Sequence, residues 1–590
     1  MTLAVKIKLL IQTAIQELYG VNIDTEQLTI NNTKDEFEGQ YTFVTFGLSK
    51  TLRKKPEEIG EEMGHYLVAN QEDIEAYSVI KGFLNLSFQT TLFSNQLEAI
   101  FSQKNYGTSQ NNGKRIMVEF SSPNTNKPLH FGHLRNIFLG DAISSILKAN
   151  GYEVIKANLI NDRGIHICKS MIAWQLFAQG ATPQSTHTKG DHFVGDYYVK
   201  FNDEHNKQIQ EAIANGESKE VAEKNTPILK AAQELLLKWE AHDEETIALW
   251  KKMNGWVYEG FDVSYKKLGI TFDKMYYESN TYLLGKDVVL KGLQEGTMIQ
   301  KEDQSVWVDL TDHGLDEKLL LRKDGTSVYM TQDIGTAILK YEDCHMDQSV
   351  YVIGDEQNYH MQVLKLTLQK MKQAGADGIY HLSYGMVELP SGKMKSREGT
   401  VVDADDMVEE MIQIAQKNTE ELGKVDGFTQ EELTSLYATL GLGALKFYLL
   451  RVDPKKRMIF DPKESIDFHG YTAPFVQYTH ARICSILRKN SEPIQHMMPA
   501  EFSKQEIQLI QFFDQYVDTL HHAAHTFNPA LVCNYLYELS QHYNSFLVNH
   551  SILKAENKAL QNNRMMMSIV CKNIIQHGMQ LLGIQVPERM

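Results

Sequence analysis

The hydrophobic positions of the first hundred residues follow two different spacings. Apolar residues recur at helical intervals over residues 3–19, at Leu3, Ile7, Leu10, Ile11, Ile15 and Leu18. The β-branched and aromatic segments EGQYTFVTFGL and SVIKGFLNLSF predict strands, whereas PEEIGEEMGHYLV, opened by Pro56 and acidic residues, predicts a helix. We therefore expect a small α+β domain over residues 1–108, closed by the polar, Gly- and Asn-rich linker SQKNYGTSQNNGKR.

From residue 115 the pattern becomes strand, helix, strand. RIMVEF predicts a strand, HLRNIFLGDAISSILKANG a helix stopped by Gly151, and EVIKANLI a second strand. Such a unit implies a parallel sheet with a right-handed crossover. Strand patterns return at residues 305–310, 328–330 and 349–355, each followed by helical spacing. Residues 109–400 are thus expected to form an α/β, Rossmann-type doubly wound parallel sheet, with a helical insertion at about 180–245.

Beyond residue 403 the strand patterns stop. Six long segments carry hydrophobic residues at helical spacing, from DMVEEMIQIAQKN to RMMMSIVCKNIIQHGMQLLG. Residues 401–590 are therefore expected to form a helical linker and an α-helical bundle.

Composition narrows the class of protein. Lys plus Arg is 59 and Asp plus Glu is 75, a balance of 59 − 75 = −16, which disfavours a generic polyanion-binding surface but leaves local basic faces open. The five cysteines are scattered without a CxxC pair, which favours reduced thiols in a cytoplasmic protein and provides no zinc framework. No apolar run approaches the roughly 20 residues that span a bilayer, so no membrane partner is expected.

The segment SSPNTNKPLHFGH, residues 121–133, lies where an open α/β sheet binds ligands. It follows the first strand of the parallel sheet and opens the next helix, whose N-terminus offers unpaired N–H groups and a positive dipole end. Gly132 lets a ligand approach the backbone, and His130 and His133 can donate to phosphate oxygens. For HxGH alone, a helix cap and a surface histidine are the simpler interpretation; the surrounding pattern favours an anion site.

A second segment, GKMKSREGT at residues 392–400, places three basic residues within five positions between two glycines. Such a loop can close over a triphosphate and neutralise charge as pyrophosphate leaves. Alone it is a weak signal, because charged turns are usually solvated.

Together the two segments resemble the signatures of class I aminoacyl-tRNA synthetases. The wider motifs VEFSSPNTNKPLHFGHLRN, VYMTQDIGTA, VIGDEQNYHMQ, KMKSREGTVVDADDM, FVQYTHARICSILRK and LLGIQVPERM resemble the arginyl-tRNA synthetase family. GFLN at residues 82–85 fits the additional N-terminal domain of that family, so the resemblance covers essentially the whole chain.

The resemblance implies a reaction in two steps. Arginine is activated with ATP and Mg²⁺ to arginyl-adenylate, and the arginyl group then passes to the terminal adenosine of tRNA(Arg), with tRNA required for activation. His130, His133, Lys127 and Lys393 are the implied catalytic residues. The signature's second lysine is replaced by Ser396, so Lys127 is expected to compensate; Gly132, Lys395, Ser396 and Arg397 are expected to bind ATP.

Arginine recognition requires acceptors in the plane of the guanidinium group, ideally a carboxylate. By resemblance Tyr329 and Asp333 form this pocket, Asn124 and Gln357 hold the amino acid, and Glu119 and Ser122 lie beside it. Asp333 could alternatively be a helix N-terminal acid. No protein-bound metal is expected.

The tRNA contacts implied by the resemblance lie in both terminal domains: Asn85, Phe88, Tyr478, His480, Arg482, Tyr543 and Met590. Most aromatic residues at helical spacing belong to a core, which is the alternative for each of them. A monomer is expected. Two other functions stay open at this point: an HxGH nucleotidyltransferase, which would not need the C-terminal bundle, and a tRNA-binding protein that has lost catalysis.

Overall fold

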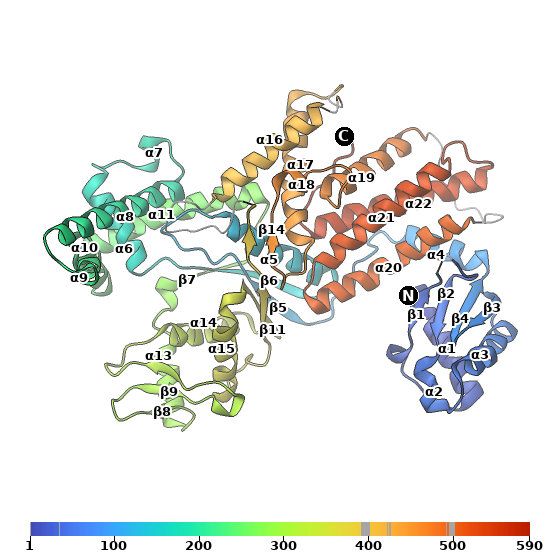
Figure 1. Cartoon of the computed structure of the whole chain (residues 1–590), viewed down its shortest axis with the longest axis horizontal. Helices are drawn as coiled ribbons and strands as arrows, with labels where there is room; N and C mark the ends of the chain where they lie inside the picture. The colour runs from blue at the N-terminus through green and yellow to red at the C-terminus, as the bar shows by residue number, and fades with distance from the viewer. Residues whose placement is uncertain are drawn as a thin grey trace.

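The computed structural model describes residues 2–34, 36–390, 402–421, 423, 426–490, 493–494 and 502–590. The molecule is elongated, with a central sheet, a helical lobe at one end and a helical bundle toward the other (Figure 1). The N-terminal domain and a lobe with a small sheet project from the same side (Figure 1).

The N-terminal domain is an antiparallel sheet covered by helices, as the hydrophobic pattern predicted. The sheet order is β1 (Ile30–Asn32), β2 (Tyr41–Val44), β4 (Phe83–Phe88), β3 (Ile74–Ile80). Gly82, with φ 80°, makes the turn between β3 and β4, where a side chain would be strained. The helices are α1 (Leu3–Tyr19), α2 (Phe46–Leu52), α3 (Pro56–Asn70) and α4 (Thr90–Ser102).

The central domain contains a five-stranded parallel sheet. Its order is β12 (Ile379–Tyr384), β11 (Gln348–Gly354), β5 (Arg115–Glu119), β6 (Glu153–Ile160), β7 (Lys274–Tyr277). All four neighbouring pairs run parallel, with Glu119 opposite Ala157 on one side and Tyr351 on the other. The chain therefore starts in the middle at β5 and winds outward in both directions. Ligands bind such a sheet at the carboxyl ends of β5 and β11, where the winding reverses.

Helix α5 (Phe131–Ala149) links this sheet to the C-terminal bundle. Its apolar residues are buried almost all round, because it packs on β6 and β11 and also against four helices of the C-terminal region. Arg135 is completely buried within it and donates to the carbonyl oxygens of Gly385, Lys456, Asp453 and Pro454. The start of α5 is thereby held against two distant chain segments.

The expected insertion is helical but longer than residues 180–245. It comprises α6 (Ile165–Phe177), α7 (Pro183–Thr186), α8 (Gly190–Ala214), α9 (Lys219–Asn225), α10 (Pro227–Glu240) and α11 (Glu244–Leu268). Helices α6, α8 and α11 pack on one another and form the lobe at the left of Figure 1.

Two of the expected strands differ in the structure: one belongs to another sheet, and the other is the start of a helix. Residues 306–308 form β9 (Val306–Val308) in a separate antiparallel sheet between β8 (Ile299–Gln300) and β10 (Lys318–Leu321). Tyr329 and Met330 begin helix α14 (Tyr329–Cys344) and are not a strand. A three-residue apolar run is too short to separate strand from helix, and alternation alone does not tell which sheet a strand joins. The lobe with this small sheet also contains α12 (Glu278–Thr281), α13 (Gly285–Gln294) and α15 (Asn358–Lys370).

The C-terminal region is helical, as predicted, apart from β14 (Met458–Ile459), which pairs with β13 (Val387–Glu388). Its helices are α16 (Ala404–Glu421), α17 (Gln430–Leu450), α18 (Pro462–Ser465), α19 (Ala473–Arg488), α20 (Lys504–Thr526), α21 (Ala530–Asn549) and α22 (Lys558–Leu581). Among the described residues, α17 alone has the length and apolar composition of a membrane-spanning helix, and 67% of its most apolar window is buried. Because it packs between α16, α19 and α5, we interpret it as a core helix.

Candidate active site

The loop after β5 presents two histidines at the start of α5. His130 is the residue that caps α5, and its backbone N–H donates to Nδ1 of His133 at 3.0 Å. The two rings stack with centroids 3.8 Å apart, and Nδ1 of His130 is buried without a hydrogen-bond partner. Burial lowers the pKa of His130 to about 4, and Lys127 adds to the effect. Both imidazoles are therefore neutral near pH 7, because burial also lowers the pKa of His133 well below its usual value.

In the same loop, Gly132 lies close to the ring of His130. A Cβ on Gly132 would lie 3.1 Å from two atoms of the His130 ring, so a side chain there would press on the stacked histidines. Lys127 is half-buried, and burial lowers the pKa of its ammonium group. A buried cation beside two neutral imidazoles is a suitable environment for a phosphate group, which would restore the charge balance.

A cavity of about 370 Å³ opens beside this loop. The loop contributes residues from Asn124 to His130, and the insertion contributes His166, His192 and Tyr198. Asp403 lies on the remaining side. This cavity joins the predicted anion-binding segment to the helical insertion.

A second cavity, of about 640 Å³, contains the predicted guanidinium-binding residues. Asp333 lies in the second turn of α14 and Tyr329 at its first residue, with 78% of Tyr329 exposed. Oδ2 of Asp333 lies 2.6 Å from Nε2 of His360 on α15. Asn124 lines both cavities, as does His166.

The second cavity contains a carboxylate that the sequence reasoning missed. Glu278 follows β7, and burial raises its pKa to about 7, although the nearby Arg163 opposes the shift. Arg163 is itself held 3.2 Å from Glu240 and over the ring of Tyr282. The signal that could have identified Glu278 is its place at the carboxyl end of a parallel strand, the same criterion that identified the loop after β5.

Three of the residues predicted to bind arginine lie outside both cavity linings. The carboxylate of Glu119 forms a buried ion pair with Lys340 of α14. Ser122 has φ 44°, and its N–H donates to Oδ1 of Asn158 at 3.0 Å. Gln357 is exposed in a 3₁₀ turn after β11. Glu119 and Ser122 thus have partners within the fold, and their place beside bound arginine stays a prediction.

The cationic signature residues Lys393, Lys395, Ser396 and Arg397 lie outside the described residues. The chain that follows them runs beside the histidine loop: the N–H of Phe131 donates to the carbonyl oxygen of Val402 at 2.9 Å, and that of Ala404 donates to Leu129 at 3.0 Å. The histidine loop is thus joined by backbone hydrogen bonds to residues 402 and 404.

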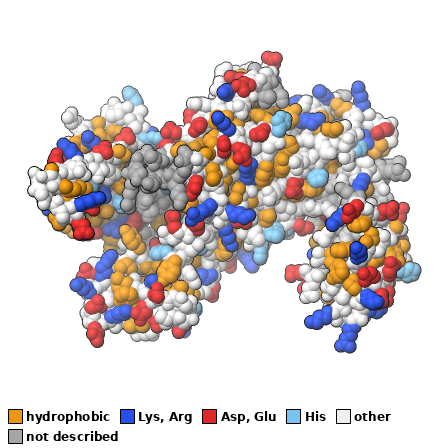
Figure 2. Space-filling view, in the orientation of Figure 1, with side chains coloured by type: hydrophobic (Ala, Val, Ile, Leu, Met, Phe, Trp, Pro, Cys, Tyr) orange, Lys and Arg blue, Asp and Glu red, His pale blue; other side chains and the backbone are white. Residues whose placement is uncertain are grey.

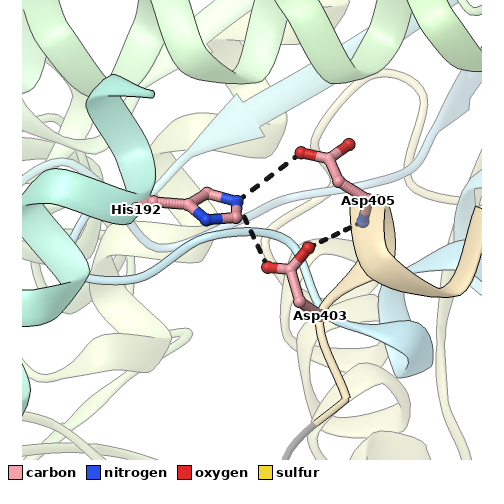
Figure 3. A group of neighbouring side chains, drawn as sticks. All are labelled: His192, Asp403 and Asp405. Atoms are coloured by element: carbon pink, nitrogen blue, oxygen red, sulfur yellow. Dashed lines mark hydrogen bonds and ion pairs between the residues drawn. The ribbon is translucent and has the colours of Figure 1, made fainter. Parts of the chain in front are cut away.

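A charged cluster joins the chain at residues 403–405 to the helical insertion. Nε2 of His192 on α8 lies 3.4 Å from Oδ2 of Asp403 and 3.5 Å from Oδ2 of Asp405 (Figure 3). These three side chains are close enough to hold a metal ion, but Nζ of Lys189 already lies 2.6 Å from Asp405. We interpret the group as an ion-pair cluster between α8 and the start of α16, in which the hydrogen bond to Asp405 raises the pKa of His192.

The residues predicted to contact tRNA divide by burial. Asn85, Phe88, His480 and Tyr543 are all at most 4% exposed. Tyr543, for example, donates its hydroxyl to Ser568 at 2.9 Å, and Nδ1 of His480 lies 2.9 Å from the carbonyl oxygen of Pro587. These four are buried in this structure, and contact with RNA stays a prediction for them. Tyr478, Arg482 and Met590 are half-buried, so contact with RNA stays a prediction for these three.

Comparisons with known proteins follow the same domains. The family model described as "tRNA synthetases class I (R), catalytic domain" matches residues 96–461. The "Arginyl tRNA synthetase N terminal domain" matches residues 5–88 and the "DALR anticodon binding domain" residues 476–590. A parallel sheet with an HxGH loop at its switch point and these matches define a class I aminoacyl-tRNA synthetase.

Relatives that match over nearly the whole chain identify the family within this class of synthetases. The chain is 51% identical over 583 residues to the arginine–tRNA ligase of Bacteroides thetaiotaomicron, covering 98% of both chains. It is 49% identical over 586 residues to that of Amoebophilus asiaticus, again covering 98% of both. The arginyl-tRNA synthetase structure from Thermus thermophilus has the same fold, with a TM-score of 0.80 at 24% identity and full coverage of both chains. The chain belongs to the arginyl-tRNA synthetase family.

Proposed function

We propose that this chain, an arginine–tRNA ligase by its family, joins arginine to ATP where its two cavities meet. L-arginine, ATP and tRNA(Arg) are its substrates. The observation that carries the proposal is the contrast between adjoining cavities: one lined by Lys127 and His130, the other by Asp333 and Glu278. The first suits phosphate, the second suits a guanidinium group, and Asn124 lines both.

On the phosphate side, the substrate is ATP with its Mg²⁺. Lys127 supplies positive charge, and neutral His130 and His133 donate hydrogen bonds to charge that develops on the α-phosphate. By their motif, Lys393, Lys395, Ser396 and Arg397 act on the same phosphates. No side chain has to form a covalent intermediate, because the arginine carboxylate is itself the nucleophile.

On the arginine side, the carboxylate of Asp333 accepts hydrogen bonds from the N–H groups of the planar guanidinium group. Tyr329 and Glu278 line the same cavity. Asn124 holds the amino acid's backbone groups at the boundary. A lysine ammonium lacks the planar fork and would leave acceptors unpaired, which disfavours lysine.

Three further features are part of the proposal. The bundle and the N-terminal domain bind tRNA, the enzyme works as a cytoplasmic monomer, and tRNA is needed for activation. The contact between Asp333 and His360 supports the last point, because arginine has to displace a partner that Asp333 already holds. Binding of tRNA could supply the rearrangement that this displacement requires.

ATP–pyrophosphate exchange tests this proposal. Exchange is measured with arginine and with lysine, each with and without tRNA(Arg). We expect exchange with arginine only, and only when tRNA is present. Equal exchange without tRNA would refute the tRNA requirement, and exchange with lysine alone would refute the assignment of arginine.

A further inference from the structure

His166 occupies the boundary between the two cavities. Of the described residues, only Asn124 and His166 line both. In the proposed function the arginine carboxylate and the α-phosphate come together at this boundary. The side chains that line both cavities are therefore those that can reach the bond being made and later broken.

The two shared residues differ in chemistry. The amide of Asn124 can donate and accept hydrogen bonds but cannot take up a proton near neutral pH. The imidazole of His166 can do both. His130 also lines the phosphate-side cavity, but its buried ring stacks on His133, and burial lowers its pKa to about 4, so it is a weak proton acceptor.

A tyrosine fixes the orientation of the His166 ring. Nδ1 of His166, in the first turn of α6, lies 3.1 Å from the hydroxyl of Tyr198 on α8, and the two ring centroids are 6.0 Å apart. Tyr198 lines the phosphate-side cavity. When Nδ1–H donates to the tyrosine oxygen, Nε2 carries the lone pair. A base whose other nitrogen is oriented by a hydroxyl is a recurring arrangement for proton transfer.

We propose that His166 is the general base of the transfer step, oriented by Tyr198. The inference rests on the proposed function. The 2′-oxygen of the terminal ribose bonds to the arginyl carbonyl carbon, and the bond between that carbon and the phosphate oxygen breaks. The electron pair leaves on AMP, the hydroxyl proton passes to Nε2 of His166, and the imidazolium releases it to solvent. Tyr198 is a positioning residue.

Charged and titratable groups line both sides of this boundary. The arginine side holds Arg163, Glu240, Glu278, Arg322 and Asp333 with His166, and the phosphate side holds Lys127, Asp196, Asp403, His130 and His192. Glu240 already pairs with Arg163, and His192 lies between Asp403 and Asp405. Of the described residues, His166 is the one with a titratable side chain that lines both cavities.

The test separates activation from transfer in the full-length enzyme. Activation is measured as ATP–pyrophosphate exchange with tRNA(Arg) that lacks the terminal 2′-hydroxyl, and transfer as single-turnover formation of arginyl-tRNA with intact tRNA. His166 is exposed, so His166→Gln and His166→Ala are expected to fold. We expect exchange within about 3-fold of the unmodified enzyme and transfer slower by about 100-fold or more in both.

Glutamine distinguishes a base from a hydrogen-bonding residue, because it keeps a hydrogen bond but cannot accept the proton. Recovery of transfer in His166→Gln would overturn the proposal, as would an equal loss of exchange and transfer in either variant. Tyr198→Phe is expected to slow transfer by about 10-fold and leave exchange unchanged; a purely structural role would lower both. Absence of exchange with arginine in the unmodified enzyme would refute the proposed function, whereas the outcomes above refute the role of His166.

A matched control is available in the same lobe. His205 on α8 makes the same kind of contact, with Nδ1 2.7 Å from the hydroxyl of Thr226, and it lines neither cavity. His205→Gln is expected to leave both steps within about 3-fold. A selective loss of transfer in this variant would contradict the assignment to His166.

Discussion

At the scale of single residues, the proposed function assigns the choice of amino acid to Asp333. It lines the arginine-side cavity with 39% of its side chain exposed, and its single described ion partner is His360. A bound guanidinium would remove this carboxylate from water and pair with it through two parallel hydrogen bonds. We therefore expect the specificity for arginine to depend on this carboxylate more than on the shape of the cavity.

Replacing Asp333 with alanine is expected to lower kcat/KM for arginine by about 100-fold, roughly 3 kcal/mol, because the guanidinium would be buried without its partner. The KM for ATP should change little, since His130 and Lys127 lie in the other cavity. Asp316→Ala is the matched control: this acid lies in the same lobe with 89% of its side chain exposed and should have no effect. An unchanged kcat/KM for arginine in Asp333→Ala would remove Asp333 from the pocket.

Sequence reasoning identified residues that act within one short motif better than residues that meet across the fold. The positions of Asn124, Lys127 and His130 follow from a single loop after a strand. Glu278 and His166 each stand alone in their segments, and only the folded chain brings them to the cavities. The sequence also did not show which aromatic side chains are buried. Tyr543, for example, is completely buried in the structure.

At the scale of elements, an acidic residue of α20 connects the bundle to the N-terminal domain. Oδ2 of Asp514 accepts a hydrogen bond from the N–H of Leu3 at the start of α1, and Oδ1 accepts one from Gln96 of α4. Burial raises the pKa of Asp514 to about 6, although both hydrogen bonds oppose the shift. We therefore expect the contact between Asp514 and the start of α1 to depend on pH.

The sign of this dependence follows from the raised pKa. The folded state binds the proton more tightly than the unfolded chain, whose aspartate pKa is about 3.9. The stabilising contribution is complete below about pH 4 and is lost as pH rises through about 6, about 3 kcal/mol in total. Between pH 5 and 7.5 the loss is about 1.4 kcal/mol, or about 10-fold in the opening of α1.

Hydrogen exchange of the α1 amides, corrected for intrinsic rates, measures this opening. We expect protection about 10-fold higher at pH 5 than at pH 7.5, and no such difference in Asp514→Asn. Glu538→Gln is the control, because this acid is exposed on α21, another helix of the bundle. A pH dependence that persists in Asp514→Asn would show that another group controls the docking.

Helices were predicted better than strands because of their length. Segments such as α1, α17 and α20 repeat their hydrophobic spacing over several turns, whereas β8, β9 and β10 have two to four residues each. Short strands also take their sheet partners from distant parts of the chain. The sequence pattern therefore indicated the parallel sheet but placed β9 in the wrong sheet and read the start of α14 as a strand.

At the scale of the whole molecule, a chain with a net charge of −16 has to bind a polyanion. Acidic and basic side chains are interspersed over the face shown in Figure 2, without a single-sign surface. Recognition of tRNA therefore depends on local contacts of the terminal domains more than on a general attraction. The elongated arrangement, with the cavities between the central sheet and the insertion, separates these domains from the chemistry (Figure 1).

In the proposed function, arginine and ATP occupy adjoining cavities that meet at Asn124 and His166. A crystal structure with a non-hydrolysable arginyl-sulfamoyl-adenosine tests it most directly. We predict that the guanidinium group contacts Asp333, that the sulfamoyl group, standing for the phosphate, lies between Asn124 and His166, and that the adenosine lies on the His130 side. A guanidinium bound on the His130 side, or a molecule bound without contact to Asp333, would contradict this account.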